Sequence, residues 1–201
     1  MTAISTLVPT YATVNLAALA HNLSCITGYL SPSCKVLAIV KANAYGHGAV
    51  AIAQSLASHG IERFAVASLD EGIELRQAGL NAPILILGAL FEEQIADLVA
   101  HRLTPVVSDG RILPALAKAV RAHPAPYQIH LKVETGMGRL GLSLDELPTI
   151  LDDQILRSPL QVEGVMTHLA DADGADSAFT ERQLGAFHAM LEQIRLRGLT
   201  L

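Results

Sequence analysis

The stretch AIVKANAYGHGAV occupies residues 38–50 of a chain of 201 residues. The apolar run that leads into it, Leu37–Val40, is typical of a strand buried on both faces, and it ends abruptly on Lys41. Small residues, a tyrosine, a histidine and two glycines follow. Strands that are apolar on both faces belong to parallel sheets covered by other structure on each side. The stretch therefore predicts a parallel strand with a polar, tightly turning loop at its carboxyl end.

The same strand pattern recurs along the chain, alternating with helical segments. Apolar runs occur at Val36–Val40, Phe64–Ala67, Ile84–Leu87, Thr104–Val107, Ile129–Val133 and Val162–Thr167. Helical periodicity occurs at Leu16–Tyr29, His47–Ser58, Leu69–Gln77, Phe91–Ala100, Arg111–Ala122, Leu144–Leu151 and Thr180–Arg197. Glycines stand where three of these helices are expected to end, at Gly60, Gly79 and Gly198. The alternation predicts an α/β fold.

Two architectures fit six consecutive strand–helix units, a doubly wound sheet and a (β/α)8 TIM-type barrel. The phosphate-binding patterns GxGxxG and GxxxxGK[ST] are both absent, which favours the barrel. Six strands are fewer than the eight of a closed barrel, and the final residues, RGLTL, stand where a seventh strand would begin. Because an open six-stranded remnant leaves two unpaired edges, we expect residues 1–201 to be an incomplete barrel from a longer protein, truncated after about six units.

Composition narrows the class of protein. Apolar residues make up 51% of the chain and the net charge is -5, without a basic patch, so the sequence predicts a packed core and no nucleic-acid partner. Neither a membrane-spanning apolar run nor a secretory signal is recognisable. Cys25 and Cys34 form no disulfide framework, and CxxC and HExxH motifs are absent. We therefore expect a cytoplasmic protein without a metal site or membrane contact.

Polar residues at the ends of the predicted strands are the candidate functional groups, since catalytic residues of barrels lie at the carboxyl ends of strands. The first strand ends in Lys41 with Tyr45 four residues later, and the second ends in Ser68. The fifth carries Lys132 and runs into a glycine-rich segment that contains Arg139, and the sixth ends in His168. A lysine, a tyrosine, an arginine and a histidine would thus meet at one end of the sheet.

Each candidate has an ordinary structural interpretation beside the functional one. Burial would favour the neutral amine of Lys41, the form that attacks a carbonyl to make a Schiff base, but strand-end lysines also extend to solvent. Arg139 is suited to a carboxylate ligand or to a surface ion pair. Lys132 on a buried strand needs an anionic partner or a chemical modification. His168 fits a general base, a ring that stacks on a cofactor, or a hydrogen-bonded strand-end residue.

Two long motifs give the chain a family resemblance. VKANAYGHG and LKVETGMGRLG, about ninety residues apart, resemble the two signatures of alanine racemases, and THLADAD is similar to a third motif of that family. The resemblance extends from about Thr10 to the end of the chain. Glu134 is a departure, because the family more often has aspartate there, and it retains the charge.

The resemblance implies a fold-type III enzyme that uses pyridoxal 5'-phosphate. It implies that Lys41 forms the Schiff base with the cofactor and is the base on one face of the substrate. By the same resemblance, Tyr45 contacts the cofactor phosphate, and Arg139 lies near the cofactor's phenolic oxygen and the substrate carboxylate. Lys132, which is often carbamylated in the family, orients Arg139. His168 packs beside the pyridine ring.

The implied reaction is the interconversion of L-alanine and D-alanine, which supplies D-alanine for peptidoglycan in the cell wall. Racemisation of this kind needs proton donors on opposite faces of the substrate, and in the family the second is a tyrosine from a C-terminal β-domain of the partner subunit. We therefore expect residues 1–201 to be the N-terminal cofactor-binding barrel, a full-length homodimer to be the active isomerase, and this chain alone to be inactive.

Other functions remain open at the level of sequence. A non-catalytic barrel that carries pyridoxal phosphate would also place a lysine on an early strand, and a complete eight-stranded chain of this length would favour it. A racemase for another amino acid, such as serine, would share the motifs. A barrel that binds a metal or phosphate without pyridoxal phosphate would give no Schiff-base absorbance that depends on Lys41.

Overall fold

The computed structural model describes residues 12–155 and 158–199. Within them one parallel sheet has strands in the order of the sequence, so each strand pairs with the next along the chain. The strands are β1 (Leu37–Ile39), β2 (Arg63–Val66), β3 (Ile84–Ile86), β4 (Thr104–Val107), β5 (Tyr127–Lys132) and β6 (Leu160–Met166). This sequential parallel order is the topology of a barrel of β–α units rather than of a doubly wound sheet.

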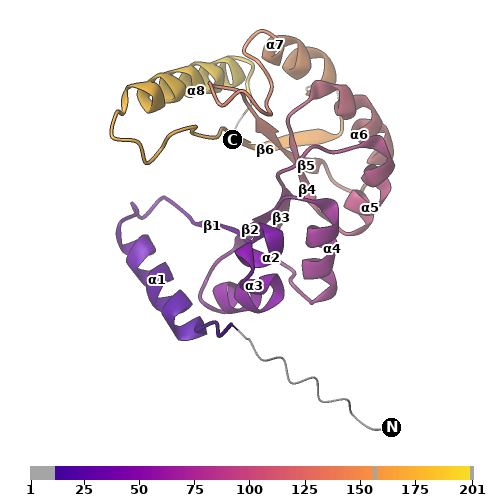
Figure 1. Ribbon diagram of the computed structural model, residues 1–201. Coiled ribbons are helices and arrows are strands. Elements are labelled where there is room, and N and C mark those ends of the chain that lie inside the picture. The colour runs from indigo at the N-terminus through magenta and orange to yellow at the C-terminus, as the bar shows by residue number, and fades with distance from the viewer. Residues whose placement is uncertain (1–11, 156–157, 200–201) are drawn as a thin grey trace.

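Helices connect the strands and lie along the outer side of the curled sheet, with α1 and α8 on the two sides of the opening (Figure 1). The α-helices are α1 (Leu16–Gly28), α2 (Lys41–Tyr45), α3 (Ala49–Ser58), α4 (Leu69–Gln77), α5 (Ile95–Ala100), α6 (Leu113–Ala119), α7 (Leu147–Thr149) and α8 (Ala178–Leu196). Short 3-10 turns η1 (Glu92–Gln94) and η2 (Gly110–Ile112) precede α5 and α6, and a wide π-turn, η3 (Ile150–Ile155), follows α7.

The core has two layers, one on each face of the sheet. The larger layer joins the outer face of the sheet to the helices, and Phe64 and Leu98, for example, are fully buried in it. The smaller layer contains side chains of the strands and of Leu87 just after β3, with Ala65, Leu85 and Val106 at its centre. Such an inner layer of strand residues is the packing expected inside a barrel.

An ion pair crosses the inner face of the sheet. The ladder between β5 and β6 is irregular after Ile129, where Glu163 has no register partner on β5. A bulge of this kind turns a side chain that alternation would place elsewhere. Glu163 Oε1 lies 2.6 Å from Arg63 Nη2 on β2, and Glu163 Oε2 lies 3.3 Å from His130 Nε2 on β5. The contact therefore links β6 to a strand that is not its neighbour in the sheet.

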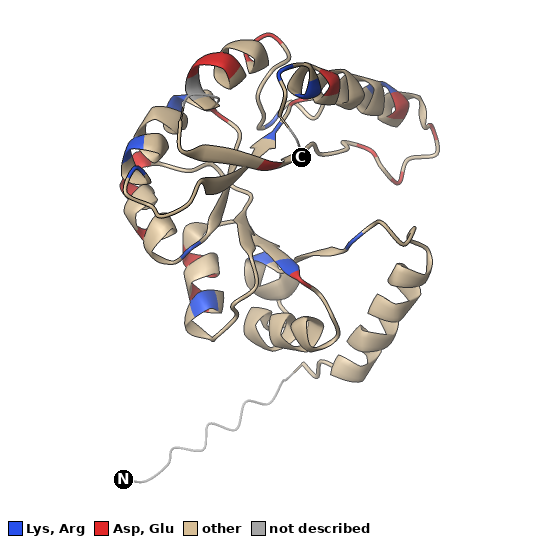
Figure 2. Ribbon diagram, turned by 180° about the vertical axis from the view of Figure 1, so that it is seen from behind, with Lys and Arg blue, Asp and Glu red and all other residues tan. Residues whose placement is uncertain are grey.

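Charged residues elsewhere are distributed over the helices and loops with the two signs interspersed (Figure 2). No helix in the described ranges is both long and apolar enough to span a bilayer. The same ranges contain no cluster of three or more His, Cys, Asp or Glu side chains placed to hold a metal ion.

The predicted strands and the α/β barrel class are confirmed, and the predicted helix ends at Gly60, Gly79 and Gly198 have the positive φ angles expected of them. Two expectations were wrong in detail. The helix expected over 144–151 is instead a short turn of α7 continued by η3, because Pro148 favours only a helix start. The helix expected from His47 begins at Ala49, since a separate turn, α2, occupies residues 41–45.

Candidate active site

Lys41 follows β1 after one residue, Val40, and opens a turn with unusual backbone geometry. Ala42, Asn43, Ala44 and Tyr45 all have φ angles between 51° and 54°, which places four consecutive non-glycine residues in the left-handed region. An L-residue in a left-handed helix costs roughly 1–2 kcal/mol. The segment after Lys41 is thus a strained turn that the surrounding structure must hold, and such strain is concentrated at functional sites in proteins.

One side chain from outside the turn, that of Glu71, holds its backbone in place. Glu71 on α4 accepts the Ala42 amide at 2.6 Å through one carboxylate oxygen. Its other oxygen accepts the amides of Ala67 at 2.7 Å and Ser68 at 3.1 Å. Glu71 therefore fastens the loop after β1 to the loop after β2.

Within the motif itself, Asn43 Oδ1 accepts the amide of Ala49 at 2.7 Å. Ala49 is the first residue of α3, and the helix N-cap Gly48 supplies no side chain. Asn43 thus provides the capping oxygen that Gly48 lacks. This bond ties the strained turn to the start of the following helix.

The second glycine-rich segment wraps around a carboxylate of its own. Glu134, just after β5, accepts backbone amides from Gly136, from Gly138 at 2.9 Å and from Arg139 at 3.3 Å. These bonds hold the pKa of Glu134 below its usual range against the opposing effect of burial. At Gly141, φ is +148° and a Cβ atom would lie 2.6 Å from the Glu134 amide nitrogen, so only glycine fits. The carboxylate thereby fixes the backbone that carries Arg139.

Lys132 and His168 complete the group of basic side chains. Lys132 ends β5 and is only 7% exposed. Its pKa is lowered by burial first, then by the charges of Arg139 and Lys41, with Glu134 opposing the shift. The pKa of His168 is lowered by partial burial and then by the charges of Arg139, Lys132 and Lys41. The four groups lie at or after the carboxyl ends of parallel strands, and the charges of Arg139 and Lys41 act on the other two.

The structure thus brings together Lys41, Lys132, Arg139 and His168, which come from the ends of β1, β5 and β6. Tyr45, the other predicted cofactor contact, belongs to the same loop as Lys41, and it is 60% exposed. Ser68, which ends the second predicted strand, is the N-cap of α4. Its position is therefore explained by helix capping.

Two residues at this end of the sheet escaped prediction from the sequence. Glu71 was signalled only as part of the capping box Ser68–Glu71, which gives no hint of its bond to Ala42. Gln183 on α8 is fully buried and bonds to the loops after β5 and β6. A single glutamine in a helix carries no sequence signal for such a role.

The basic group has the chemistry of a site for an anionic ligand. Across residues 12–155 and 158–199, no ion pair joins Lys41, Lys132, Arg139 or His168 to an acidic side chain. Cations that repel one another at the end of a buried sheet are stabilised by a bound anion. Pyridoxal phosphate carries a phosphate and an aldehyde, so a donor set of two lysines, an arginine and a histidine fits it.

Comparison with known proteins identifies relatives for this arrangement. The sequence profile described as "Alanine racemase, N-terminal domain" matches residues 14–201. The alanine racemase of Carboxydothermus hydrogenoformans is 39% identical over 191 residues, which are 95% of this chain and 51% of that protein.

Solved structures agree with the sequence match. An alanine racemase of Clostridium difficile 630 superposes with a TM-score of 0.92 at 31% identity, covering 98% of this chain and 52% of that one. An alanine racemase of Bacillus anthracis with bound L-Ala-P superposes with a TM-score of 0.83 at 30% identity, covering 93% of this chain and 48% of that one. The chain spans about half the length of the relatives it matches. On sequence and structure alike, it belongs to the alanine racemase family and corresponds to the family's N-terminal domain.

Proposed function

We propose that this chain forms the cofactor-binding part of an alanine racemase, the pyridoxal phosphate-dependent isomerase that interconverts L-alanine and D-alanine. The observation that carries the proposal is the convergence of Lys41, Lys132, Arg139 and His168 at one end of the sheet. When bound, pyridoxal phosphate would supply the electron sink that makes the α-proton of an amino acid acidic. The protein then has to bind and orient the substrate and to exchange the proton on its Cα atom.

In this proposal Lys41 has two functions. Its Nζ atom would hold the cofactor through the aldehyde carbon, with loss of water, and as a free amine it would exchange the proton on one face of the substrate Cα atom. The bond of Glu71 to the Ala42 amide holds the backbone next to Lys41. Tyr45, in the same turn, would donate its hydroxyl to the cofactor phosphate.

Arg139 would bind the substrate carboxylate through its guanidinium group and lie beside the phenolic oxygen of the cofactor. Lys132 would orient Arg139. Its lowered pKa leaves more neutral amine, which can add carbon dioxide to form a carbamate with the loss of one proton. Such a carbamate would turn a repulsive neighbour of Arg139 into an attractive one. His168, whose pKa is also lowered, would pack as a neutral ring beside the pyridine.

The remaining features of the proposal concern the whole protein. We propose that residues 1–201 form the N-terminal barrel domain and that a β-domain of a partner subunit supplies a tyrosine as the second base, so that the active protein is a homodimer. The relatives' names support alanine as substrate. As part of this proposal, the enzyme is cytoplasmic and provides D-alanine for peptidoglycan.

The test is cofactor binding by the chain itself. Pyridoxal phosphate is added to the wild type and to Lys41→Ala, the absorbance of the Schiff base is recorded, and borohydride followed by peptide mapping locates the modified lysine. We expect a Schiff-base band and labelling at Lys41, and loss of both in Lys41→Ala. Equal labelling of Lys35 or Lys118, both outside the basic group, or a band that survives in Lys41→Ala, would contradict the proposal.

A further inference from the structure

Gln183 is one of only two buried polar side chains in the described residues, and the other is Lys132. It lies in the first half of α8, and its side chain is 0% exposed. A buried amide without partners would cost roughly 1–3 kcal/mol, so its contacts decide why a glutamine occupies this position.

Within the described residues, every side-chain hydrogen bond of Gln183 goes to the loops after β5 and β6. Gln183 Oε1 accepts the Ala170 amide at 2.9 Å. Gln183 Nε2 donates to the carbonyl of His168 at 3.0 Å and to Thr135 Oγ1 at 3.2 Å. Since one atom accepts an amide and the other donates to a carbonyl, the orientation of the side-chain amide is determined.

The bonds continue through two threonines as a directed chain. Thr167 Oγ1 donates to the Val133 carbonyl at 3.1 Å, so it accepts from Thr135 Oγ1, which lies 2.7 Å away. Thr135 in turn accepts from Gln183. The direction Gln183 to Thr135 to Thr167 to Val133 uses each hydroxyl hydrogen once, and such chains strengthen their members.

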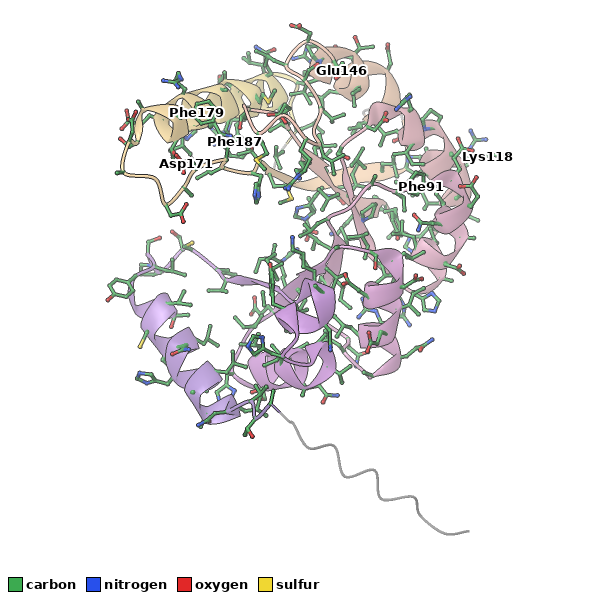
Figure 3. All side chains as sticks on the ribbon, in the orientation of Figure 1. Phe91, Lys118, Glu146, Asp171, Phe179 and Phe187 are labelled. Carbon is green, nitrogen blue, oxygen red and sulfur yellow. The ribbon has the colours of Figure 1, made fainter. Side chains whose placement is uncertain are left out.

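Packing of α8 against the glycine-rich loop supports the same role. A Cβ atom at Gly136 would lie 3.0 Å from the Phe179 ring and 3.4 Å from Gln183 Cγ. Phe179 lies on α8, and Asp171 lies on the loop between β6 and that helix (Figure 3). Helix α8 therefore touches both the segment that leads to Arg139 and the segment that contains His168.

We propose that Gln183 is a positioning residue for the candidate site, which sets the loop that carries Arg139 against the loop that carries His168. Its hydrogen bonds go to backbone and threonine partners and to neither basic side chain. This inference rests on the proposed function for its chemical meaning. Its geometry can be tested without the cofactor.

The test compares Gln183→Met, which keeps the volume but removes both hydrogen-bonding atoms, with Gln193→Met on the same helix. The readout is the NMR titration of His168, which Arg139, Lys132 and Lys41 face. His130 is an internal reference, because Arg63 and Glu163 surround it on the inner face of the sheet. We expect Gln183→Met to move the pKa of His168 towards 6.5. His130 should stay in place, and Gln193→Met should change neither.

A folded Gln183→Met protein with an unchanged His168 titration would overturn the proposal. If that variant does not fold, Thr135→Val tests the proposal instead, because it breaks the same chain of hydrogen bonds at a less buried position. Its His168 pKa should move in the same direction, and an unchanged value would again be contrary.

Pyridoxal phosphate titration separates the two proposals. In Gln183→Met we expect its affinity to fall about 5- to 30-fold while borohydride still labels Lys41. An unchanged affinity would count against the positioning role. If the wild type binds no cofactor, the proposed function fails, and the His168 titration still decides the role of Gln183.

Discussion

At the scale of single residues, the two buried polar side chains solve the problem of burial in opposite ways. Gln183 satisfies its amide with neutral partners. Lys132 instead places an amine beside Arg139 and Lys41, and both of their charges disfavour its protonation. The first arrangement stabilises the native state and the second opposes it. Its effect on folding does not explain Lys132, whereas the proposed role of orienting Arg139 at a ligand site would.

Replacing Lys132 by methionine should stabilise the protein without ligand. Removal of a buried amine from a cationic group is expected to raise the free energy of unfolding by about 1 kcal/mol, or the Tm by roughly 2–4 °C. Thermal denaturation at pH 7 in bicarbonate-free buffer measures it. Lys118→Met, on the outer side of α6 (Figure 3), is the control and should change little. A lower Tm for Lys132→Met would mean that the amine makes stabilising contacts.

The pH dependence of the same variant follows from the sign of the shift. The pKa of Lys132 is lowered in the native state, so between that lowered value and about 10.5 the unfolded chain binds more protons. This group makes stability rise with pH in that window, and Lys132→Met should flatten the rise. Burial raises the pKa of Tyr127, whose ionisation opposes folding above about pH 10 in both proteins. The difference in pH dependence of stability between the wild type and Lys132→Met therefore reports the contribution of Lys132.

At the scale of elements, the left-handed turn after β1 is the feature with the largest local strain. Its backbone is held by Glu71 from α4 and by the contact of Asn43 with α3. These bonds link it to two helices that follow it in the chain. The turn is therefore a product of tertiary structure rather than of the preference of its own residues.

Glycine substitutions should have opposite effects in this turn and in the helix after it. Ala42 is exposed with φ 51°, so Ala42→Gly relieves a steric cost that exceeds the entropy lost by glycine. We expect a gain of up to about 1 kcal/mol, against a loss of about 1 kcal/mol for Ala51→Gly in α3. Urea denaturation of both variants measures the difference. Equal losses would mean that the turn is not strained as described.

At the scale of the whole molecule, the curl of the sheet assembles the site. Lys41 follows β1 and His168 follows β6, the first and last strands in the order of the described sheet. The charge of Lys41 nevertheless contributes to the lowered pKa of His168. The pair Arg63–Glu163 joins β2 to β6 across the inner face and supports the same curvature. The site therefore depends on every strand between its two sides.

The 201-residue chain alone should form D-alanine far more slowly than a full-length relative. Racemisation by two bases needs a proton donor opposite Lys41, and loss of one general acid or base typically lowers a rate by roughly 10²–10⁴-fold. D-alanine formed from L-alanine with added pyridoxal phosphate is the measurement, with a full-length alanine racemase as the reference. Turnover at a comparable rate would contradict the proposed division of the site between two domains.

The sequence was sufficient to predict the fold, because apolar runs mark buried strands and glycines mark helix ends through local preferences. It also singled out Lys41, Lys132, Arg139 and His168, since polar residues next to predicted strands can be recognised from the sequence. It could not predict the left-handed turn, because alanine and tyrosine disfavour positive φ, and the one asparagine, which tolerates it, does not specify a turn of four residues. Nor could it predict that Gln183 is buried, since only the packing of α8 on two loops determines that.

The turn after Lys41 also has a stereochemical consequence. Its four side chains project from a backbone whose handedness is the mirror image of that of the helices around it, so the relaxed residue there is a D-amino acid. A chain made by chemical ligation with D-alanine at position 42 should fit this backbone without the crowding that L-alanine meets. The same replacement at position 51 should disrupt α3. The segment that we propose anchors the cofactor of a racemase would thus accept the mirror-image enantiomer within its own main chain.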